Sequence, residues 1–397
     1  MTGYRAVTMP TVLVLDANQR SALAIIRSLG LRGLTVIAAD KMKKSLGGAS
    51  RFAVAAARYA DPATSPREFL ADLTAIIARW SVDTIIPATD LTTMLLVNQQ
   101  NWSHFGRLAI PGREAYETLT DKARLIGLAQ TLGISVPATR IVHTQAAIRE
   151  AAEEFLFPLV LKPARSRYLK EGRIHSTAVE IVTHSALLDR ALERCAWIAD
   201  IPCLVQRFVP GHGAGIFAAF SRSGPVAWFA HRRLREKPPQ GGVSVLSESV
   251  RVDPTMRDAA AKLLAAVHWT GVAMVEFRVA DDGRFYLMEV NGRFWGSLQL
   301  AIDCGVDFPW ILYQTSQRQP VTPISTYPPG RRLRWLLGDL DSLWISLRRG
   351  NSSGCERAGS IGRFLGSFAD LSCRQEVFRW ADPGPGVREA AQWFTHP

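Results

Sequence analysis

Long apolar runs and paired cysteines are missing from this chain of 397 residues. A membrane-spanning helix needs about 20 consecutive apolar residues, and no segment approaches that length. Asp16 and Arg20 interrupt the first apolar run, so we expect neither a signal peptide nor a membrane anchor. The five cysteines are scattered and never spaced as CxxC, which argues against a disulfide framework or a structural zinc site. These absences favour a globular protein of the cytoplasm.

Several catalytic signatures are absent as well. The chain has no GxxxxGK[ST] phosphate loop, and none of its eight histidines lies in an HExxH motif. The formal net charge of +12 favours an anionic ligand. No basic run with interleaved aromatic residues follows a known nucleic-acid reader, so we do not expect a nucleic acid partner.

Strands and helices alternate over the first hundred residues. The segment TVLVLDA is typical of a buried strand, and Asn18 is a candidate cap for the helix that follows it. Gly30 is expected to end that helix, and LTVIAAD supplies the next strand of a parallel βαβ unit. Ser65, Pro66 and Glu68 predict a second helix that starts with a capping box and a proline.

Dinucleotide binding is the first function that such a domain suggests, and Asp40 falls where a ribose-binding acid is expected. The first turn, DANQRSA, contains no glycine, so the backbone has no special freedom to approach a pyrophosphate. A nicotinamide-dependent oxidoreductase therefore stays only as an alternative. We interpret Asp40 as a strand-end residue that faces solvent.

Short strands, helices and turn signals favour an α+β body after this first domain. A helix is expected to start at Thr120 or Asp121, and another to run from about Thr255 to Val267. After YPPG the chain becomes rich in arginine and tryptophan. Apolar spacing there predicts an amphipathic helix that packs on its own protein, with peripheral membrane contact as the less favoured alternative. Its apolar positions are Leu333, Leu337, Leu340, Trp344 and Leu347.

The segment GVAMVEFRVADDGRFYLMEVNGR contains two apolar runs joined through an Asp-Gly pair, which predicts a two-residue type I′ hairpin turn. Pairing Asp281 with Arg284 and counting outward puts Glu276 opposite Glu289 on one face of the hairpin. Two facing carboxylates, with Cβ atoms about 4.5 to 5.5 Å apart, repel each other. A proton or a cation is therefore expected between them.

Asn291 lies two positions beyond Glu289 and projects to the same face. Two carboxylates and an amide oxygen, without His or Cys, suit a hard cation such as Mg²⁺ together with nucleotide phosphates. Arg293 continues the alternation and could hold a transferring phosphoryl group. The alternative is a solvated sheet face on which Glu276 pairs with Arg278 or Arg293.

The order and spacing of four motifs resemble the ATP-grasp superfamily of carboxylate-amine and carboxylate-thiol ligases. The motifs are TDKARL, PLVLKPA, LVQRFVPG, and VEF thirteen residues before EVNGR. The resemblance covers roughly residues 10–315 and implies α/β and α+β architecture. It predicts a Rossmann-like parallel-sheet domain (1–112), a small subdomain with a linker helix (113–203), a large subdomain with the metal site (204–324) and a small, partly helical C-terminal appendage (325–397).

The resemblance also implies residue roles. Lys122 and Lys162 are expected to contact ATP, which fits a lysine near a helix N-terminus and a lysine at the end of an apolar strand. The hinge QRFVPG is expected to border adenine. The expected metal ligands for Mg²⁺, with Mn²⁺ as a substitute, are Glu276, Glu289 and Asn291, and Arg293 is the expected phosphate-binding arginine. The hinge residues are Gln206, Arg207, Phe208 and Val209.

This sequence departs from the family pattern at three places. The loop after Lys162 has one glycine where many relatives have a glycine-rich lid. Gln206 replaces the commoner acid, and Gly213 stands about where relatives place a ribose-binding carboxylate. A basic segment, HRRLRE, follows an apolar strand. We expect Arg232 or Arg235 in it to bind the acidic substrate, with a solvated basic strand end as an equal alternative.

The resemblance implies an ATP-dependent ligase. ATP would phosphorylate a small-molecule carboxylate to an acyl phosphate, and an amine, or a thiol, would then displace phosphate. A site of metal, lysines and arginine needs no Ser-His-Asp or Cys-His arrangement for such chemistry. Alternatives are a carboxylase-like enzyme that activates bicarbonate to a carbamate, and a non-catalytic nucleotide-binding regulator. The oligomeric state stays open.

Overall fold

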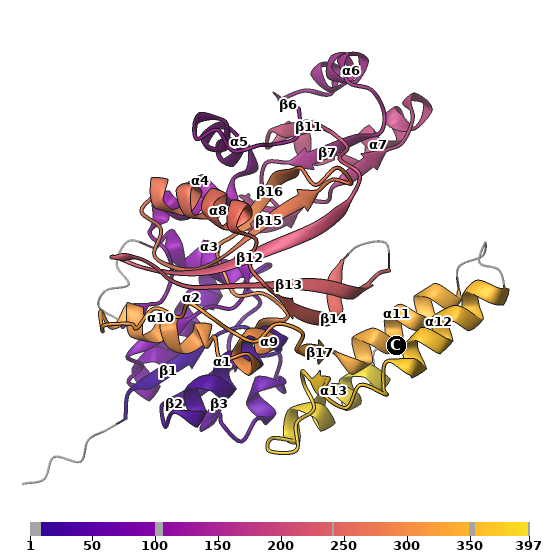
Figure 1. The fold of residues 1–397 in the computed structure, drawn as a ribbon. Coiled ribbons are helices and arrows are strands. Elements are labelled where there is room, and N and C mark those ends of the chain that lie inside the picture. The colour runs from indigo at the N-terminus through magenta and orange to yellow at the C-terminus, as the bar shows by residue number, and fades with distance from the viewer. Residues whose placement is uncertain (1–8, 100–105, 240–241, 349–353, 396–397) are drawn as a thin grey trace, which may run out of the picture.

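The computed structural model describes residues 9–99, 106–239, 242–348 and 354–395. Its first domain is a five-stranded parallel sheet in the order β3-β2-β1-β4-β5, flanked by helices (Figure 1). The strand order changes direction between β1 and β4, and open α/β sheets bind ligands at such a switch point. The elements are β1 (Thr11–Val14), α1 (Arg20–Leu31), β2 (Thr35–Asp40), β3 (Ala55–Arg58), α2 (Pro66–Trp80), β4 (Thr84–Ile86), α3 (Asp90–Val97) and β5 (Arg107–Leu108).

Local capping in this domain differs from the prediction. Helix α1 begins at Arg20, and Asn18 does not cap it; the side-chain oxygen of Asn18 accepts a hydrogen bond from the backbone of Leu46 instead. Helix α2 starts with the predicted proline, but the Ser65 side chain makes no capping bond. Asp40 is buried, not solvent-facing, because its carboxylate accepts hydrogen bonds from two backbone N–H groups.

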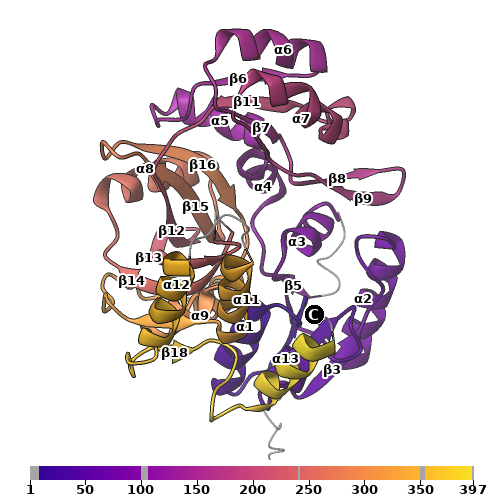
Figure 2. The same ribbon diagram turned by 90° about the vertical axis from the view of Figure 1, so that its right-hand side faces the viewer.

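A small subdomain follows, built on a four-stranded antiparallel sheet in the order β10-β7-β11-β6. Asp121, one of the two predicted caps, accepts hydrogen bonds from the first turn of α5. A separate hairpin, β8–β9, extends from this subdomain toward α2 and α3 (Figure 2). The elements are α4 (Arg113–Thr120), α5 (Lys122–Thr131), β6 (Thr139–Val142), α6 (Gln145–Glu154), β7 (Leu159–Pro163), β8 (Arg167–Lys170), β9 (Arg173–Ser176), β10 (Glu180–Val182), α7 (Leu188–Arg194) and β11 (Cys203–Arg207).

The large subdomain contains a seven-stranded sheet in the order β16-β15-β12-β13-β14-β17-β18. Phe217 and Phe229 of this sheet share one apolar core with Val14 and Ile86 of the N-terminal sheet. The shared core fixes the large sheet against the first domain, with the small subdomain above both (Figure 1). The elements are β12 (His212–Ser221), β13 (Gly224–Lys237), β14 (Val243–Val250), α8 (Pro254–Ala266), β15 (Gly271–Val279), β16 (Phe285–Asn291), α9 (Leu298–Asp303) and α10 (Phe308–Ser316).

The β15–β16 hairpin reaches the predicted pairing by a different route. Its loop has three residues, because Ala280 and not Asp281 pairs with Arg284. Gly283 adopts a φ of 82°, which suits the left-handed residue at the end of a three-residue loop. That loop alone would shift the register by one residue. Met288 has no partner in the ladder, and this bulge restores the pairing of Glu276 with Glu289.

The C-terminal segment extends the large sheet and returns to the first domain. Leu333 lies in β17 (Arg332–Arg334) rather than in the predicted helix, which begins three residues later as α11 (Leu336–Leu347). Helix α12 (Gly354–Gly366) follows, and β18 (Arg374–Gln375) pairs with β17 in parallel. The chain then crosses to α1, where Asp382 pairs with the buried Arg27, before ending in α13 (Gly384–Thr395). No helix within the described ranges is long and apolar enough to cross a membrane.

Candidate active site

Strands β15 and β16 bring two carboxylates and an amide together on one face of the hairpin. Glu276 and Glu289 are directly opposite each other. The amide nitrogen of Asn291 donates to Glu276 Oε1 at 2.8 Å and to Glu289 Oε1 at 3.4 Å. This face is therefore not a solvated strip of unrelated charges. Its three side chains converge on one point.

Cations from three different elements surround these carboxylates. Lys122 Nζ lies 3.5 Å from Glu289 Oε2 and 3.2 Å from the Ser166 hydroxyl. A guanidinium nitrogen of Arg233 lies 3.1 Å from Glu276 Oε2. Lys162 is buried on β7, and its ammonium group makes no hydrogen bond or ion pair with the described residues. The protein thus places positive charge where the opposed acids require it.

The pKa values of these groups are shifted in different directions. Burial and the neighbouring charge of Glu289 raise the pKa of Glu276. Burial would also raise the pKa of Glu289, but the charges of Lys122 and Lys162 outweigh it, and that pKa is lowered. Burial, reinforced by Lys122, lowers the pKa of Lys162 to about 8. Shifts of this kind, with specific charged partners, are typical of functional sites.

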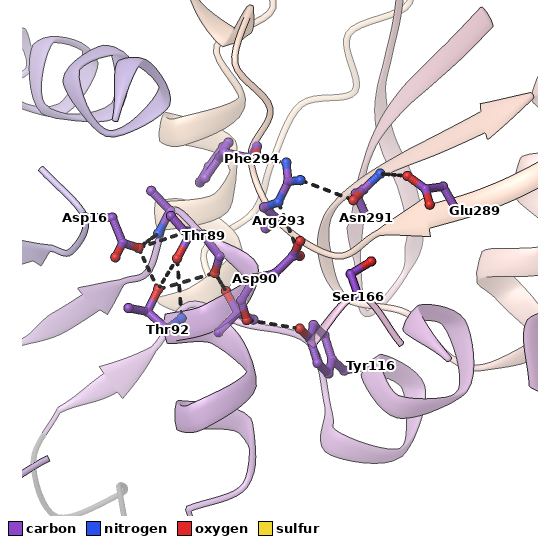
Figure 3. Close-up of polar contacts among 12 residues, drawn as sticks. Asp16, Thr89, Asp90, Thr92, Tyr116, Ser166, Glu289, Asn291, Arg293 and Phe294 are labelled. Atoms are coloured by element: carbon purple, nitrogen blue, oxygen red, sulfur yellow. Dashed lines mark hydrogen bonds and ion pairs between the residues drawn. The ribbon is translucent and has the colours of Figure 1, made fainter. Parts of the chain in front are cut away.

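Arg293 connects this hairpin to the N-terminal domain (Figure 3). Its Nε lies 3.2 Å from Asp90 Oδ1, and another of its nitrogens donates to the side-chain oxygen of Asn291 at 3.2 Å. Asp90 is the first residue of α3, directly after β4. The loop that carries it is fixed by Asp16, whose carboxylate accepts hydrogen bonds from two backbone N–H groups and from the Thr92 hydroxyl. The switch point of the parallel sheet therefore faces the carboxylates.

A cavity lies between α3, α4, the start of β8 and strand β16. Tyr116 lines it and donates a hydrogen bond to the backbone oxygen of Asp90 at 3.4 Å. The cavity thus joins groups of the N-terminal domain to the two residues Glu289 and Asn291. Its polar lining is Asp90, Asn98, Tyr116, Glu117, Thr120, Lys122, Arg165, Ser166, Arg167, Glu289 and Asn291.

The hinge predicted to border adenine lies at the end of β11. Gln206 is buried, and its amide nitrogen donates to the Thr139 hydroxyl at 2.8 Å. Its amide oxygen is buried without a donor among the described residues. Phe208 and Val209 are partly exposed, whereas Arg207 is exposed. The Val209 carbonyl accepts a hydrogen bond from Arg278, which fixes the hinge to β15.

Residues 202–336 match the family described as "ATP-grasp in the biosynthetic pathway with Ter operon". The whole chain also resembles solved ATP-grasp structures. Biotin carboxylase from Campylobacter jejuni aligns with a TM-score of 0.65 at 17% identity, over 82% of this chain and 74% of that one. N5-carboxyaminoimidazole synthetase from Staphylococcus aureus aligns with a TM-score of 0.60 at 12% identity, over 84% and 83% of the two chains. Residues 202–336 are therefore similar to an ATP-grasp family, and the chain has the fold of these solved structures.

A curated relative is the chloroplastic biotin carboxylase of Arabidopsis thaliana, which is 26% identical over 197 residues. The match covers 46% of this chain and 35% of that enzyme. The chain therefore spans about a third of the length of the curated relative that it matches.

The basic segment of β13 is arranged differently from the prediction. Arg232 pairs with Glu248 on β14, and Arg235 pairs with Asp339 on α11, so neither contacts the carboxylate cluster. Leu234 is a bulge residue without a ladder partner. The extra residue breaks the alternation, so Arg235 no longer shares a face with Arg233. Arg233 is the arginine of this strand that reaches Glu276, and it was missed.

Asp90 was also missed, because its partner Arg293 is far away in the sequence. Its contact with Arg293 joins residues about 200 positions apart, and no short motif encodes how the two domains pack. The segment PATD, directly after a predicted strand, was the available signal. Polar residues at the carboxyl ends of parallel strands are ligand-binding candidates.

The segment after Lys162 is an ordered hairpin rather than a glycine-rich loop. The backbone N–H of Ile174 on β9 donates to the carbonyl of Ala63 in the N-terminal domain at 3.1 Å. Arg165, just before the hairpin, pairs with Asp121 at 3.0 Å. This hairpin therefore contacts the first domain (Figure 2).

Proposed function

We propose that this protein is an ATP-dependent ligase that phosphorylates a carboxylate substrate and passes the acyl group to an amine. The observation that carries the proposal is the opposed pair Glu276 and Glu289, with Asn291 beside it and Lys122, Lys162 and Arg233 around it. Such a charge arrangement suits a divalent cation with a polyphosphate. The similarity to ATP-grasp ligases supports the same conclusion.

Lys122 and Lys162 are proposed to contact the phosphates of ATP. The backbone of Arg207, Phe208 and Val209, next to the buried Gln206, is proposed to border adenine. The free amide oxygen of Gln206 could accept a hydrogen bond from a donor on the bound base. Arg293 is proposed to hold the transferring phosphoryl group, because its guanidinium lies beside the carboxylates.

The residues present fit a magnesium ion after one small change. The described residues contain no cluster of three or more His, Cys, Asp or Glu, so the set consists of two carboxylates and one amide. Asn291 directs its amide nitrogen toward both carboxylates, and flipping the amide presents its oxygen instead. Oxygen ligands of this number are typical of Mg²⁺, which neutralises phosphate charge when bound.

The acceptor is proposed to occupy the cavity lined by Asp90, Tyr116 and Arg167. Most charged groups there are already paired: Asp90 with Arg293, and Arg165 with Asp121. No partner of Arg167 is found among the described residues. This guanidinium is therefore the candidate that binds an anionic group of the substrate.

The proposed steps balance as follows. A carboxylate oxygen of the substrate attacks the γ-phosphorus of ATP, and the bond to the bridging oxygen breaks to release ADP. The amine nitrogen then attacks the acyl carbon, the carbon–oxygen bond to phosphate breaks, and the nitrogen loses one proton. Positioning and charge neutralisation are sufficient for both steps.

A second candidate is a carboxylase-like enzyme that activates bicarbonate. Its support is that the similar structures include biotin carboxylase and N5-carboxyaminoimidazole ribonucleotide synthetase, and that one of them is a biotin carboxylase domain in complex with MgADP and bicarbonate. Release of orthophosphate that depends on bicarbonate alone selects this candidate. Release that depends on an organic acid and an amine selects the ligase.

The deciding experiment is a mass-spectrometric screen of pooled acids and amines with the full chain, ATP and Mg²⁺. We expect a condensation product together with ADP and phosphate, and none from the Glu289→Gln variant. Formation of AMP in place of ADP would refute the acyl-phosphate route. If ATP is not hydrolysed in the presence of any acid, amine or bicarbonate, the non-catalytic regulator is favoured.

A further inference from the structure

Helix α11 buries polar residues against the protein, while its apolar residues are half-buried or, at Trp344, exposed. Its buried residues are Gly338, Asp339 and Ser342. Asp339 binds Arg235, and the Ser342 hydroxyl donates to the backbone oxygen of Glu236 at 2.7 Å. Trp344 on the opposite side is 56% exposed. A surface helix normally buries its apolar residues most deeply, whereas the buried residues of α11 are Gly338, Asp339 and Ser342.

The outward side of α11 forms an apolar groove with the end of α13. Its volume is about 640 Å³. The indole of Trp393 crosses to α11 and donates to Asp341 Oδ1 at 2.8 Å, while Phe394 beside it is 75% exposed. The groove is lined by Lys237, Leu340, Asp341, Leu343, Trp344, Ile345, Leu347, Trp393 and Phe394.

Exposed aromatic side chains are confined to this part of the molecule. Six Trp and Phe side chains are exposed in the described residues, and all six lie in the C-terminal segment. Helices α11 and α12 also project from the body of the protein (Figure 1). The exposed side chains are Trp344, Phe368, Phe378, Trp380, Trp393 and Phe394.

The acidic residues of this surface have hydrogen-bond or ion-pair partners, whereas an arginine lies over an exposed aromatic ring. Asp341 is neutralised by Lys237, and Glu389 accepts a hydrogen bond from the indole of Trp335 at 2.6 Å. The exposed Arg348, in contrast, lies over the ring of Trp344 at 4.2 Å. Both acids are therefore paired with a donor, and a cation remains beside the exposed Trp344. Exposed Trp, Phe and Leu with arginine at the margin are typical of helices that lie in the interface of an anionic membrane.

We propose that the surface formed by α11 and α13 docks on an anionic lipid bilayer. Trp344 and Phe394 enter the boundary between headgroups and acyl chains, and Arg348 stays at the level of the lipid phosphates. The proposal does not depend on the catalytic function, because the groove lies apart from the carboxylate cluster.

Vesicle sedimentation of the full chain tests this proposal. One set of vesicles contains phosphatidylcholine with about 30% phosphatidylglycerol, and the other contains phosphatidylcholine alone. We expect binding to the anionic vesicles that weakens by about tenfold or more in the Trp344→Glu variant. A second variant, Phe394→Ser in the last turn of α13, tests the proposal in case Trp344→Glu does not fold. It should weaken vesicle binding by a smaller factor. The matched control is Leu156→Glu, because Leu156 is an apolar residue outside the groove whose side chain is 79% exposed. This variant should bind the vesicles like the unmodified protein.

Four results would overturn the proposal. The anionic vesicles could fail to sediment the protein, or both groove variants could bind as tightly as Leu156→Glu. Light scattering could instead show a dimer that Trp344→Glu dissociates, in which case a second copy of this chain covers the groove. Equal binding to both vesicle types would remove the electrostatic part of the argument and with it the choice of an anionic membrane.

Discussion

Arg293 Nε and Asp90 Oδ1 are 3.2 Å apart, so the end of the carboxylate hairpin is tied to the first helix after β4 of the N-terminal domain. The pair holds the guanidinium at the Asn291 side of the cluster. Asp90 therefore acts as a positioning residue in the proposed reaction.

Replacing Asp90 with Asn should lower kcat with little effect on ATP binding. The amide keeps the size of the side chain but loses the charge that orients Arg293, and a misplaced group costs about tenfold to a hundredfold in rate. Product formation with the substrates found in the screen measures the first quantity, and calorimetry with ATP the second. Asp189→Asn, which alters an exposed ion pair with Arg149, is the matched control. Unchanged kcat in Asp90→Asn would show that Arg293 needs no partner.

Neutralising Glu276 and neutralising Glu289 should change the thermal stability of the protein in opposite directions. The raised pKa of Glu276 means that its ionised form is disfavoured in the folded protein, so Glu276→Gln should raise Tm by about 1 to 2 °C at pH 7.5. The lowered pKa of Glu289 means that its charge is favoured, so Glu289→Gln should lower Tm. Scanning calorimetry without divalent ions measures both.

The pH dependence of these two effects provides an internal control. A carboxyl with a raised pKa destabilises the folded state above that pKa, and this effect disappears below the unfolded value of about 4.3. The gain from Glu276→Gln should therefore vanish as the pH falls toward 4. Both variants should lose condensation activity, because each removes a proposed metal ligand. A pair of variants with equal Tm would contradict the proposed asymmetry.

The titration of Lys162 should give kcat/KM for ATP a specific pH profile. Its pKa of about 8 in the free protein means that its charge is present at pH 7 and is lost as the pH rises through 8. The value of kcat/KM for ATP reports the free enzyme and should fall above that pH. Lys162→Arg keeps a charged group over this range and should remove the fall. The same profile in both proteins would assign the titration to another group.

The sequence predicted that Glu276 and Glu289 face each other, but it described the hairpin that pairs them incompletely. The Asp-Gly signal identified the hairpin, but the loop has three residues, and the bulge at Met288 compensates for the extra one. A local motif can predict a turn, whereas a bulge depends on how the strands pack. The same limit explains Arg235, since the bulge at Leu234 removes it from the face that Arg233 occupies.

Parallel strands and the fold class were readable because they follow from hydrophobic periodicity and helix signals. Contacts between distant segments were not. Nothing near Asn18 shows that its oxygen binds Leu46 rather than a helix end. Nothing near Asp339 shows that it binds Arg235, about 100 positions earlier in the chain.

Arg233 and Arg232 form a natural comparison, because they are neighbours on β13 with different partners. Arg233→Met removes the charge that neutralises Glu276, so the carboxylates should need a higher Mg²⁺ concentration or lose kcat/KM by about tenfold. Arg232→Met breaks only the pair with Glu248 and should change kcat/KM by less than about twofold. Titration of activity with Mg²⁺ distinguishes the two variants. A stronger effect of Arg232→Met would return the substrate-binding role to that residue.

Asp382 should be a main determinant of stability, although it lies far from the site. Its carboxylate accepts a hydrogen bond from Arg27 Nε at 2.8 Å, from the Ser50 hydroxyl at 2.8 Å and from the backbone of Arg51 at 2.9 Å. Burial lowers the pKa of Arg27, and its side chain is only 5% exposed, so it cannot regain water when its partner is removed. Breaking a buried pair on one side costs about 3 kcal/mol or more.

Asp382→Ala should therefore lower the free energy of unfolding by about 3 kcal/mol in urea titrations, while Asp189→Ala, which breaks an exposed pair, should cost less than about 0.5 kcal/mol. The double variant Arg27→Met with Asp382→Ala should recover part of the loss, because no charge is then left buried without a partner. An equal loss in the single and double variants would mean that the Ser50 and Arg51 contacts, rather than the ion pair, hold the C-terminal segment on the first domain. In either case the nucleotide-dependent properties of Lys162 should not change, since the carboxylate cluster shares no residue with this contact.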